Sequence, residues 1–341
     1  MLHLVTGGSG FIGNLIARKL LAAGNRVRVF DTWSDASRPG GIEFVKASVL
    51  DRDAVKSALT GVDVVHHAAG LVAQTRAGKS YQQVNAHGTL IVAEEAVIAG
   101  VLAIVHLSTT AVFGLPPDGP ITNDTQLCPI EDYGRSKLAG EQAMERICRA
   151  SGMPLITIRP RAALGAGRLG IFQILFDWVK DGRNVYVIGD GNQPMQFIHA
   201  DDLIEFYMLA LELQRPGTYN VGTDSFGTLR NDLTALIQHV GSPARIIGLS
   251  PLLAINALRT LHHLRLSPLV PWHYLTYHRA CYFDVAPLLA MGWRPKYSNE
   301  QMLIESYDWF ATMQPGEFSE SGSPHRTPLG QAALKIAKLM S

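Results

Sequence analysis

The stretch VTGGSGFIG (residues 5–13) follows a short apolar run, LHLV (2–5), and leads directly into a helical pattern. Gly7 permits a tight turn after a strand, and Gly10 lets the backbone come close to a pyrophosphate. Gly13 removes a side chain where a helix and a strand must pack closely. The helix then presents its N-terminal amides to the anion. The stretch therefore predicts a dinucleotide-binding turn at the start of the chain.

Short apolar runs and helical patterns alternate through the first half of the chain. Five apolar or β-branched runs are predicted as strands, and segments with helical spacing lie between them. Strands that are apolar almost throughout are typical of a parallel sheet covered by helices on both faces, so the predicted class is α/β. The strands are expected at 2–5, 26–30, 63–69, 103–109 and 154–159, and the helices at 14–24, 51–59, 85–100 and 136–151.

The composition excludes several classes of function. The chain has 341 residues, of which 47% are hydrophobic and 17% charged, enough to bury a full core. A net charge of +1 does not favour nucleic-acid binding. The three cysteines are scattered without a CxxC pair, so we expect no metal site. We also expect no secretory signal and no membrane-spanning run, and therefore a cytoplasmic protein.

Two aspartates are candidates for contacts with the cofactor. Asp31 ends the second predicted strand, where a carboxylate can accept both ribose hydroxyls of NAD and repel the 2′-phosphate of NADP. NAD is therefore favoured over NADP, although an aspartate at a strand end also commonly begins a turn. Asp51 either caps the helix that follows it or contacts the adenine amino group, and the two roles are compatible.

Five blocks occur in order along the chain: the glycine loop, HHAAG (66–70), VNAHGT (84–89), LSTTAVFG (107–114) and YGRSK (133–137). With them the chain resembles the extended short-chain dehydrogenase/reductase family, which includes NAD-dependent epimerases and dehydratases and a 3β-hydroxysteroid dehydrogenase-like branch. The resemblance implies an NAD-dependent enzyme with a Rossmann-type, doubly wound parallel sheet and a smaller C-terminal substrate domain.

The resemblance also implies an organisation into domains. Residues 1–160 are expected to form the NAD-binding Rossmann domain, to which segments near 196–222 return. Residues 161–313 would mostly form the substrate domain. Residues 314–341 are expected to be a linker followed by a C-terminal amphipathic helix.

YGRSK places a phenol and an ammonium four residues apart, on one face of a helix. The spacing alone also fits a solvated surface pair. In the family that the chain resembles, this tyrosine is the general acid/base, which assigns that role to Tyr133 and a supporting role to Lys137. A free phenol has a pKa near 10, and we expect the ammonium and a cationic nicotinamide to lower it.

The resemblance assigns further residues of the site. Thr109 matches the hydroxyl residue that holds the reacting oxygen, and Asn85 matches an asparagine that supports the lysine. The predicted catalytic set is Thr109, Tyr133, Lys137 and Asn85. The predicted cofactor contacts are Gly7, Gly10, Phe11, Ile12, Gly13, Asp31, Asp51, Ala68, Ala69, Gly70, Tyr133, Lys137 and Pro160.

Departures from the nucleotide-sugar pattern bear on the substrate. Nucleotide-sugar relatives commonly have an asparagine at the place of Ala162, and an Arg-Asp pair, whose arginine meets a diphosphate, at the place of Met195 and Gln196. Thr-Thr-Ala at 109–111 also differs from the Thr-Asp-Glu of sugar 4,6-dehydratases. The leucine-rich stretch LSPLLAINALRTLHHLRLSPLVPWHYL (249–275) is more similar to 3β-hydroxysteroid dehydrogenase-like members and 3-oxo-lipid reductases.

These features predict an NAD-dependent oxidoreductase that interconverts a secondary alcohol and a ketone on a β-keto lipid or steroid-like substrate. The alternatives are a nucleotide-sugar 4-epimerase with tightly bound NAD, and a catalytically silent NAD-sensing protein. Residues 249–271 are expected to form either a core helix, or a lipophilic pocket wall or weak membrane-surface contact. The resemblance also implies a homodimer that pairs residues 85–100 and 136–147.

Overall fold

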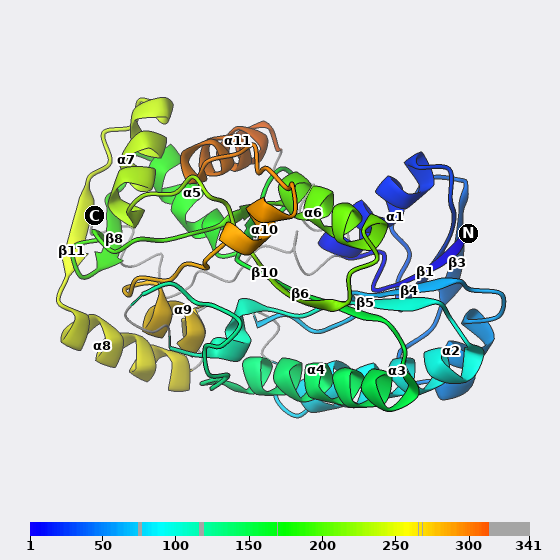
Figure 1. The fold of residues 1–341 in the computed structure, drawn as a ribbon. Helices are drawn as coiled ribbons and strands as arrows, with labels where there is room; N and C mark the ends of the chain where they lie inside the picture. Colours follow the sequence, from blue (N-terminus) through cyan, green and yellow to red (C-terminus); the bar gives the residue numbers. More distant parts are fainter. Residues whose placement is uncertain (74–76, 116–118, 169, 265, 268, 314–341) are drawn as a thin grey trace.

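The computed structural model describes residues 1–341 apart from 74–76, 116–118, 169, 265, 268 and 314–341, so the predicted linker and C-terminal helix lie outside the described residues. Among the described residues, the largest sheet has seven strands in the order β10-β6-β5-β4-β1-β2-β3 (Figure 1). All of its strand pairs are parallel. Its strands are β1 (Leu2–Thr6), β2 (Arg26–Asp31), β3 (Ile42–Lys46), β4 (Val64–His67), β5 (Ala103–Leu107), β6 (Leu155–Pro160) and β10 (Gly217–Val221).

This strand order confirms the predicted Rossmann-type, doubly wound sheet. The five predicted strands became β1, β2, β4, β5 and β6, while β3 and β10 were not predicted. The predicted division of the chain at residue 160 stays a prediction.

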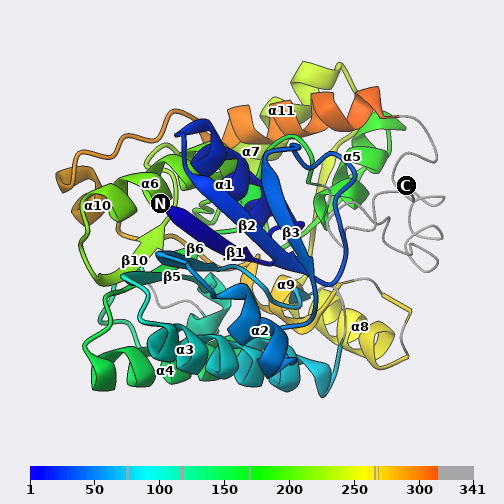
Figure 2. The same cartoon turned by 90° about the vertical axis from the view of Figure 1, so that its right-hand side faces the viewer.

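Helices cover both faces of the sheet (Figures 1 and 2). The central strands are apolar, and residues such as Val5, Val65 and Ile104 are fully buried between the two helical layers. Burial on both faces explains why these strands read as continuous apolar runs. One layer contains α1 (Phe11–Ala22) and α6 (Ala200–Glu212), and the other contains α2 (Arg52–Ala58), α3 (Thr89–Ala99) and α4 (Asp132–Ser151).

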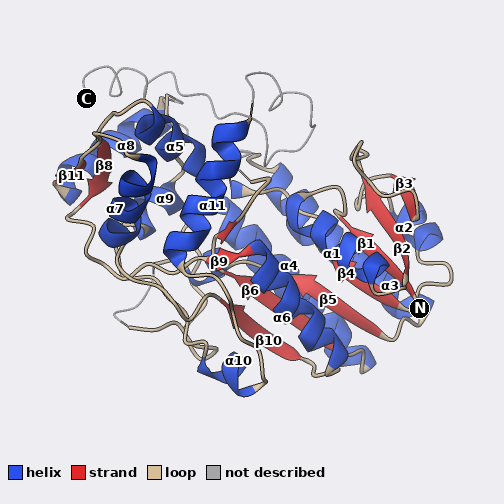
Figure 3. Ribbon diagram, turned by 90° about the horizontal axis from the view of Figure 1, so that it is seen from above, coloured by secondary structure: helices blue, strands red, loops and turns tan. Residues whose placement is uncertain are grey.

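Much of the chain after β6 gathers beyond the carboxyl ends of the sheet strands (Figure 3). Two small sheets lie there, one pairing β7 (Ala163–Leu164) with β9 (Ile198–His199), the other β8 (Val185–Ile188) with β11 (Ile246–Leu249). The remaining helices are α5 (Phe172–Lys180), α7 (Leu229–Val240), α8 (Pro251–His263), α9 (Pro271–Thr276), α10 (Ala286–Ala290) and α11 (Asn299–Thr312).

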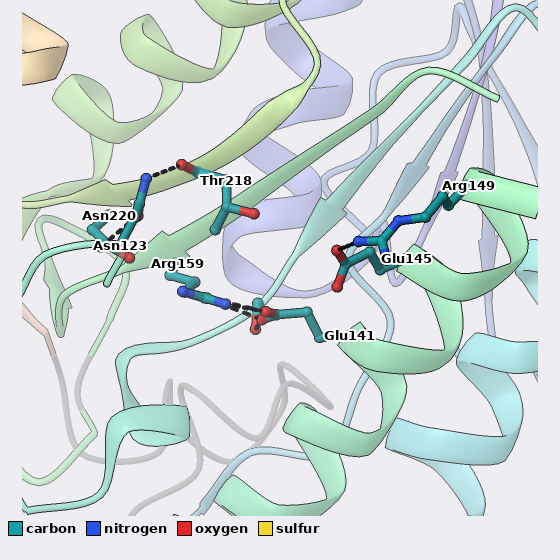
Figure 4. A network of polar contacts seen from close by, with 8 residues as sticks. Asn123, Glu141, Glu145, Arg149, Arg159, Thr218 and Asn220 are labelled. Atoms are coloured by element: carbon teal, nitrogen blue, oxygen red, sulfur yellow. Dashed lines mark hydrogen bonds and ion pairs between the residues drawn. The ribbon is translucent and has the colours of Figure 1, made fainter. Parts of the chain in front are cut away.

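A buried ion pair ties α4 to β6 (Figure 4). The guanidinium of Arg159 on β6 donates hydrogen bonds to the carboxylate of Glu141 on α4, and their side chains are 7% and 6% exposed. The Ser108 hydroxyl donates to the same carboxylate, so the end of β5 is held as well. A second pair on α4, Glu145 with Arg149, is exposed. The buried pair is therefore the one that holds α4 in place.

We expect Glu141→Gln to lower the free energy of unfolding by about 3–5 kcal/mol, because Arg159 would keep a buried charge without its partner. Glu145→Gln is the matched control on the same helix and should cost at most about 1 kcal/mol. Urea unfolding of both variants measures the difference. Equal, small losses in the two variants would contradict the role given to the buried pair.

Candidate active site

A cavity of about 400 Å³ opens at the carboxyl ends of β1, β4, β5 and β6. Its volume lies in the range of roughly 300–1,000 Å³ that is usual for small-molecule sites. From β1 the chain runs outward through β2 to β3, and it then returns to form β4 on the other side of β1. The cavity therefore lies where the strand order reverses. Predicted residues that line the cavity are Gly7, Gly10, Phe11, Ile12, Gly13, Asp31, Ala68, Ala69, Gly70, Thr109, Tyr133, Lys137 and Pro160.

The glycine loop packs backbone against backbone. Gly7 has a φ of +69°, and a Cβ at this position would lie 2.6 Å from the backbone of Ala69. A Cβ on Gly13 would overlap the carbonyl oxygen of Gly7. Helix α1 begins after Gly10, which gives it no side-chain cap. The arrangement fits a dinucleotide, because the N-terminal amides of α1 suit a pyrophosphate at this end of the cavity.

The Asp31 carboxylate is oriented by backbone amides. It accepts hydrogen bonds from the N–H groups of Ser9, at 3.0 Å, and Thr32, at 2.7 Å. Burial raises the pKa of Asp31, and these amide hydrogen bonds oppose the rise. Asp31 thus both fastens the glycine loop to β2 and presents a carboxylate to the cavity.

Asp51 caps α2, because its carboxylate accepts a hydrogen bond of 3.1 Å from the N–H of Ala54. The structure therefore bears out the capping role. Ala47, Ser48 and Val49 line the neighbouring part of the cavity, where Asp51 was expected. The contact of Asp51 with adenine stays a prediction.

Tyr133 and Lys137 lie one turn apart at the start of α4 and face the cavity. Lys137 is 6% exposed, which excludes a solvated surface pair, and its ammonium donates a 2.7 Å hydrogen bond to the carbonyl of Leu107. Burial lowers the pKa of Lys137 to about 8, and the charge of Glu141 opposes that change. Burial raises the pKa of Tyr133 to about 12, and a hydrogen bond with Thr109 opposes that rise.

The pKa of Tyr133 is raised rather than lowered in this structure, and the effect of a cationic nicotinamide on it stays a prediction. The dominant effect on the phenol is its removal from water, which favours the neutral form. The ammonium of Lys137 is directed to the end of β5, while the phenol is paired with Thr109. Burial therefore favours the protonated form of Tyr133.

Two glycines allow α4 to approach the turns that carry the rest of the site. A Cβ on Gly134 would lie 2.7 Å from the carbonyl oxygen of Ala111, in the short helix η3 (Thr110–Phe113). A Cβ on Gly140 would overlap the carbonyl oxygen of Asn85 in η2 (Gln82–Gly88). The first contact brings Tyr133 beside Thr109.

Asn85 supports the site through its neighbours. Its Oδ1 accepts a 2.7 Å hydrogen bond from the N–H of Leu71, and its Nδ2 donates to the Leu71 carbonyl and to Ser136 Oγ, both at 3.1 Å. These bonds fix the turn after Gly70 against α4. Among the described residues, the hydrogen bonds of Asn85 do not include the Lys137 ammonium, so any support of that lysine is indirect.

Sequence reasoning missed several residues that line the cavity. Arg161, Arg168, Trp272, His273 and Tyr277 all belong to its wall. Arg161 directly follows Pro160, so its place beside a predicted cofactor contact was a signal that could have identified it. The other four come from segments whose position depends on the tertiary fold.

The leucine-rich stretch 249–271 was expected to be a core helix or a pocket wall. Within 249–271 no described residue lines the cavity, and Leu252 and Leu253 on α8 are 72% and 71% exposed. Trp272 and His273, in the WHYL that ends the stretch 249–275, do line the cavity. Only Ala254 is buried among the residues of α8. In the described part of the chain, no helix is both long and apolar enough to span a membrane.

The dinucleotide-binding turn, the sheet order and the Tyr133–Lys137 pair define an extended short-chain dehydrogenase/reductase. The model of the NAD dependent epimerase/dehydratase family matches residues 3–222. The chain belongs to this family, and its cofactor is NAD.

Individual relatives agree with this assignment. The chain is 40% identical over 334 residues to the uncharacterized protein y4nG of Sinorhizobium fredii, a match that covers 98% of this chain and 84% of that protein. It is 31% identical over 270 residues to UDP-glucose 4-epimerase of Mycolicibacterium smegmatis, covering 71% of this chain and 84% of the relative. The crystal structure of Thermus thermophilus UDP-glucose 4-epimerase with NAD superposes with a TM-score of 0.74 at 25% identity, covering 92% and 100% of the two chains.

We expect Gly134→Ala to lower the kcat of the NAD-dependent reaction by roughly 100-fold. The added methyl group would push Tyr133 away from Thr109, and small displacements of a catalytic group reduce the rate strongly. NAD affinity should change by only a few fold, since the glycine loop is untouched. Gly40→Ala is the control, because a Cβ there meets nothing within 4 Å. Unchanged kcat in Gly134→Ala would show that the close approach of α4 is not needed.

Replacement of Asp31 by Asn should shift the cofactor preference from NAD toward NADP by about tenfold, because it removes the negative charge that is predicted to bind the ribose hydroxyls and to repel a 2′-phosphate. The amide oxygen can still accept the Ser9 N–H, so the loop should stay in place. Titration of the variant with both cofactors gives the ratio of the two dissociation constants. An unchanged ratio would mean that Asp31 only organises the turn.

Proposed function

We propose that this protein is an NAD-dependent 4-epimerase of a nucleotide sugar. The observation that carries the proposal is the pairing of Tyr133 with Thr109 on the wall of the cavity that also holds the glycine loop and Asp31. A sugar hydroxyl placed there would meet a proton acceptor and a hydrogen-bond donor together. The UDP-glucose 4-epimerases among the relatives support the nucleotide sugar as the substrate class.

In the proposed reaction Thr109, Tyr133 and Lys137 have different roles. Thr109 donates a hydrogen bond to the reacting oxygen, and Tyr133 accepts the proton of the substrate hydroxyl as its C–H bond breaks. NAD, when bound, supplies the acceptor of the hydride and a positive charge near the phenol. Lys137 stays fixed by the Leu107 carbonyl and adds its own positive charge. Tyr133 returns the proton to the same oxygen as the ketone is reduced again, and the carbon is inverted because the hydride would be returned to the opposite face of the ketone.

The preference for a hydrophobic substrate is not supported. It depended on the stretch 249–275 as a pocket wall, yet of its described residues only Trp272 and His273 line the cavity, and Leu252 and Leu253 are exposed. It also depended on the missing arginine at position 195. Met195 is fully buried and its sulfur contacts the Arg161 guanidinium, so the cavity is not without a cation.

Other expectations remain proposals. We retain a homodimer through α3 and α4, where Ile98 and the nearby Leu102 are exposed. Contact of the exposed leucines of α8 with a membrane surface also stays a prediction, as does the cytoplasmic location. The silent NAD-sensing protein is the least supported alternative, because the chain belongs to an enzyme family and keeps Tyr133, Lys137 and Thr109 at the cavity.

Tyr133→Phe should reduce interconversion of UDP-glucose and UDP-galactose by roughly 10²–10⁴-fold, the usual contribution of a positioned acid/base. NAD binding should change by only a few fold. Tyr186→Phe on β8, outside the cavity wall, is the control and should keep full activity. Product ratios followed by NMR measure both variants.

Two results would contradict the proposal. One is near-normal epimerisation by Tyr133→Phe. The other is a wild-type protein that reduces a β-keto lipid or a 3-keto steroid with NADH and leaves nucleotide sugars unchanged.

A further inference from the structure

Arg161 is a buried cation whose described partners are all neutral. It is 2% exposed, and its Nε donates a 2.9 Å hydrogen bond to the carbonyl of Gln196. One terminal nitrogen lies 3.1 Å from Thr110 Oγ1 and 3.0 Å from Cys281 Sγ, and the other lies 3.6 Å from Met195 Sδ. Sulfur is a weak acceptor, so part of the guanidinium's capacity for strong hydrogen bonds is unused.

The cavity has an excess of positive charge around this guanidinium. In the part of the chain that the structure describes, the ion pairs include neither Arg161 nor Arg168. Among the described cavity-lining residues, Asp31 is the only acidic one, and it is held by Ser9 and Thr32 near the glycine loop. A buried charge without a counterion is costly, so such a site favours an anionic ligand.

The position of Arg161 connects it with the substrate rather than the cofactor. It follows Pro160 at the end of β6, and it is bonded to Thr110, the neighbour of Thr109. Its other contacts come from the segments around Met195 and Cys281, which follow the Rossmann half of the chain and pair with each other. None of these contacts comes from the glycine loop.

Arg168 is a second cation of the same wall. Its guanidinium lies 5.7 Å from the ring centroid of Phe11, at the start of α1. Burial lowers the pKa of Arg168, and the nearby phenols of Tyr277 and Tyr133 oppose that change. Arg168 therefore lies between Tyr133 and the beginning of α1, where it can face either the substrate or the NAD cofactor.

We propose that Arg161 is the anion-binding group on the substrate side of the cavity and that, with Arg168 as a second cation, it holds an oxyanion of the substrate. The planar guanidinium suits two sources of this chemistry, the diphosphate of a nucleotide sugar and a carboxylate on the sugar. The inference rests on the proposed function for the identity of the ligand, but the binding of the anion can be measured without turnover.

The test uses the full-length protein saturated with NAD, so that the glycine loop is occupied. Calorimetric titrations with inorganic diphosphate, UDP, UDP-glucose and UDP-glucuronate compare the wild type with Arg161→Met and Arg161→Lys. We expect Arg161→Met to lower the affinity for the anions that bind at this site by roughly 10- to 100-fold, with NAD affinity unchanged. Arg161→Lys should lose less anion affinity, because it keeps the positive charge but not the forked donor geometry. The double variant Arg161→Met/Met195→Arg exchanges the two side chains that are in contact in the structure. It should recover part of the affinity for the anions.

The ligands distinguish the two sources. Equal losses for UDP and UDP-glucose indicate the diphosphate, and a loss confined to UDP-glucuronate indicates a sugar carboxylate. Native affinity of Arg161→Met for every anion, or no binding of any of them by the wild type, would overturn the inference. If Arg161→Met has a lowered unfolding midpoint, the inference is judged on Arg161→Lys, provided that its midpoint is native: lowered anion affinity supports the inference, and native affinity overturns it. Anion binding that depends on Arg161 in a protein that does not epimerise nucleotide sugars would contradict the proposed function alone.

Discussion

The site depends on the close approach of α4 to the turns at the carboxyl ends of the strands. Gly134 and Gly140 carry no side chains where the helix meets the backbone of Ala111 and Asn85. Glu141 then fixes the same helix to Arg159 on β6 and to Ser108 at the end of β5. A single helix thus positions Tyr133 and Lys137 against η2, η3, β6 and the end of β5. Close packing of this kind leaves little freedom for a displaced catalytic side chain.

Burial favours the neutral forms of both Tyr133 and Lys137. Burial raises the pKa of Tyr133 to about 12 and lowers that of Lys137 to about 8, so removal from water opposes both charged forms. Arg168 lies near the phenol and opposes the rise in its pKa. In the proposed mechanism a bound NAD would add a second positive charge, which would favour the phenolate further.

Much of the fold could be predicted because its signals are local. The glycine loop, the apolar strands and the YGRSK spacing all describe segments shorter than about one helix or strand. Strand β3 was missed because IEFVK, at the edge of the sheet, is neither a continuous apolar run nor a regular alternation, and β10 because it follows a long excursion of the chain. Arg168, Trp272 and Tyr277 line the cavity only after segments distant in sequence come together. The exposed face of α8 could not be distinguished from a buried one, since leucines at helical spacing fit both environments.

Epimerisation at a single carbon is tested most directly by following the hydrogen attached to that carbon. UDP-glucose deuterated at C4 is incubated with the NAD-loaded protein in ordinary water, and the product is analysed by NMR and mass spectrometry. The mechanism predicts UDP-galactose that keeps the deuterium at C4, because the hydride is removed and returned within one active site while only the hydroxyl proton exchanges. Loss of the deuterium to solvent, or no formation of UDP-galactose or any other C4 epimer from a panel of nucleotide sugars, would contradict it.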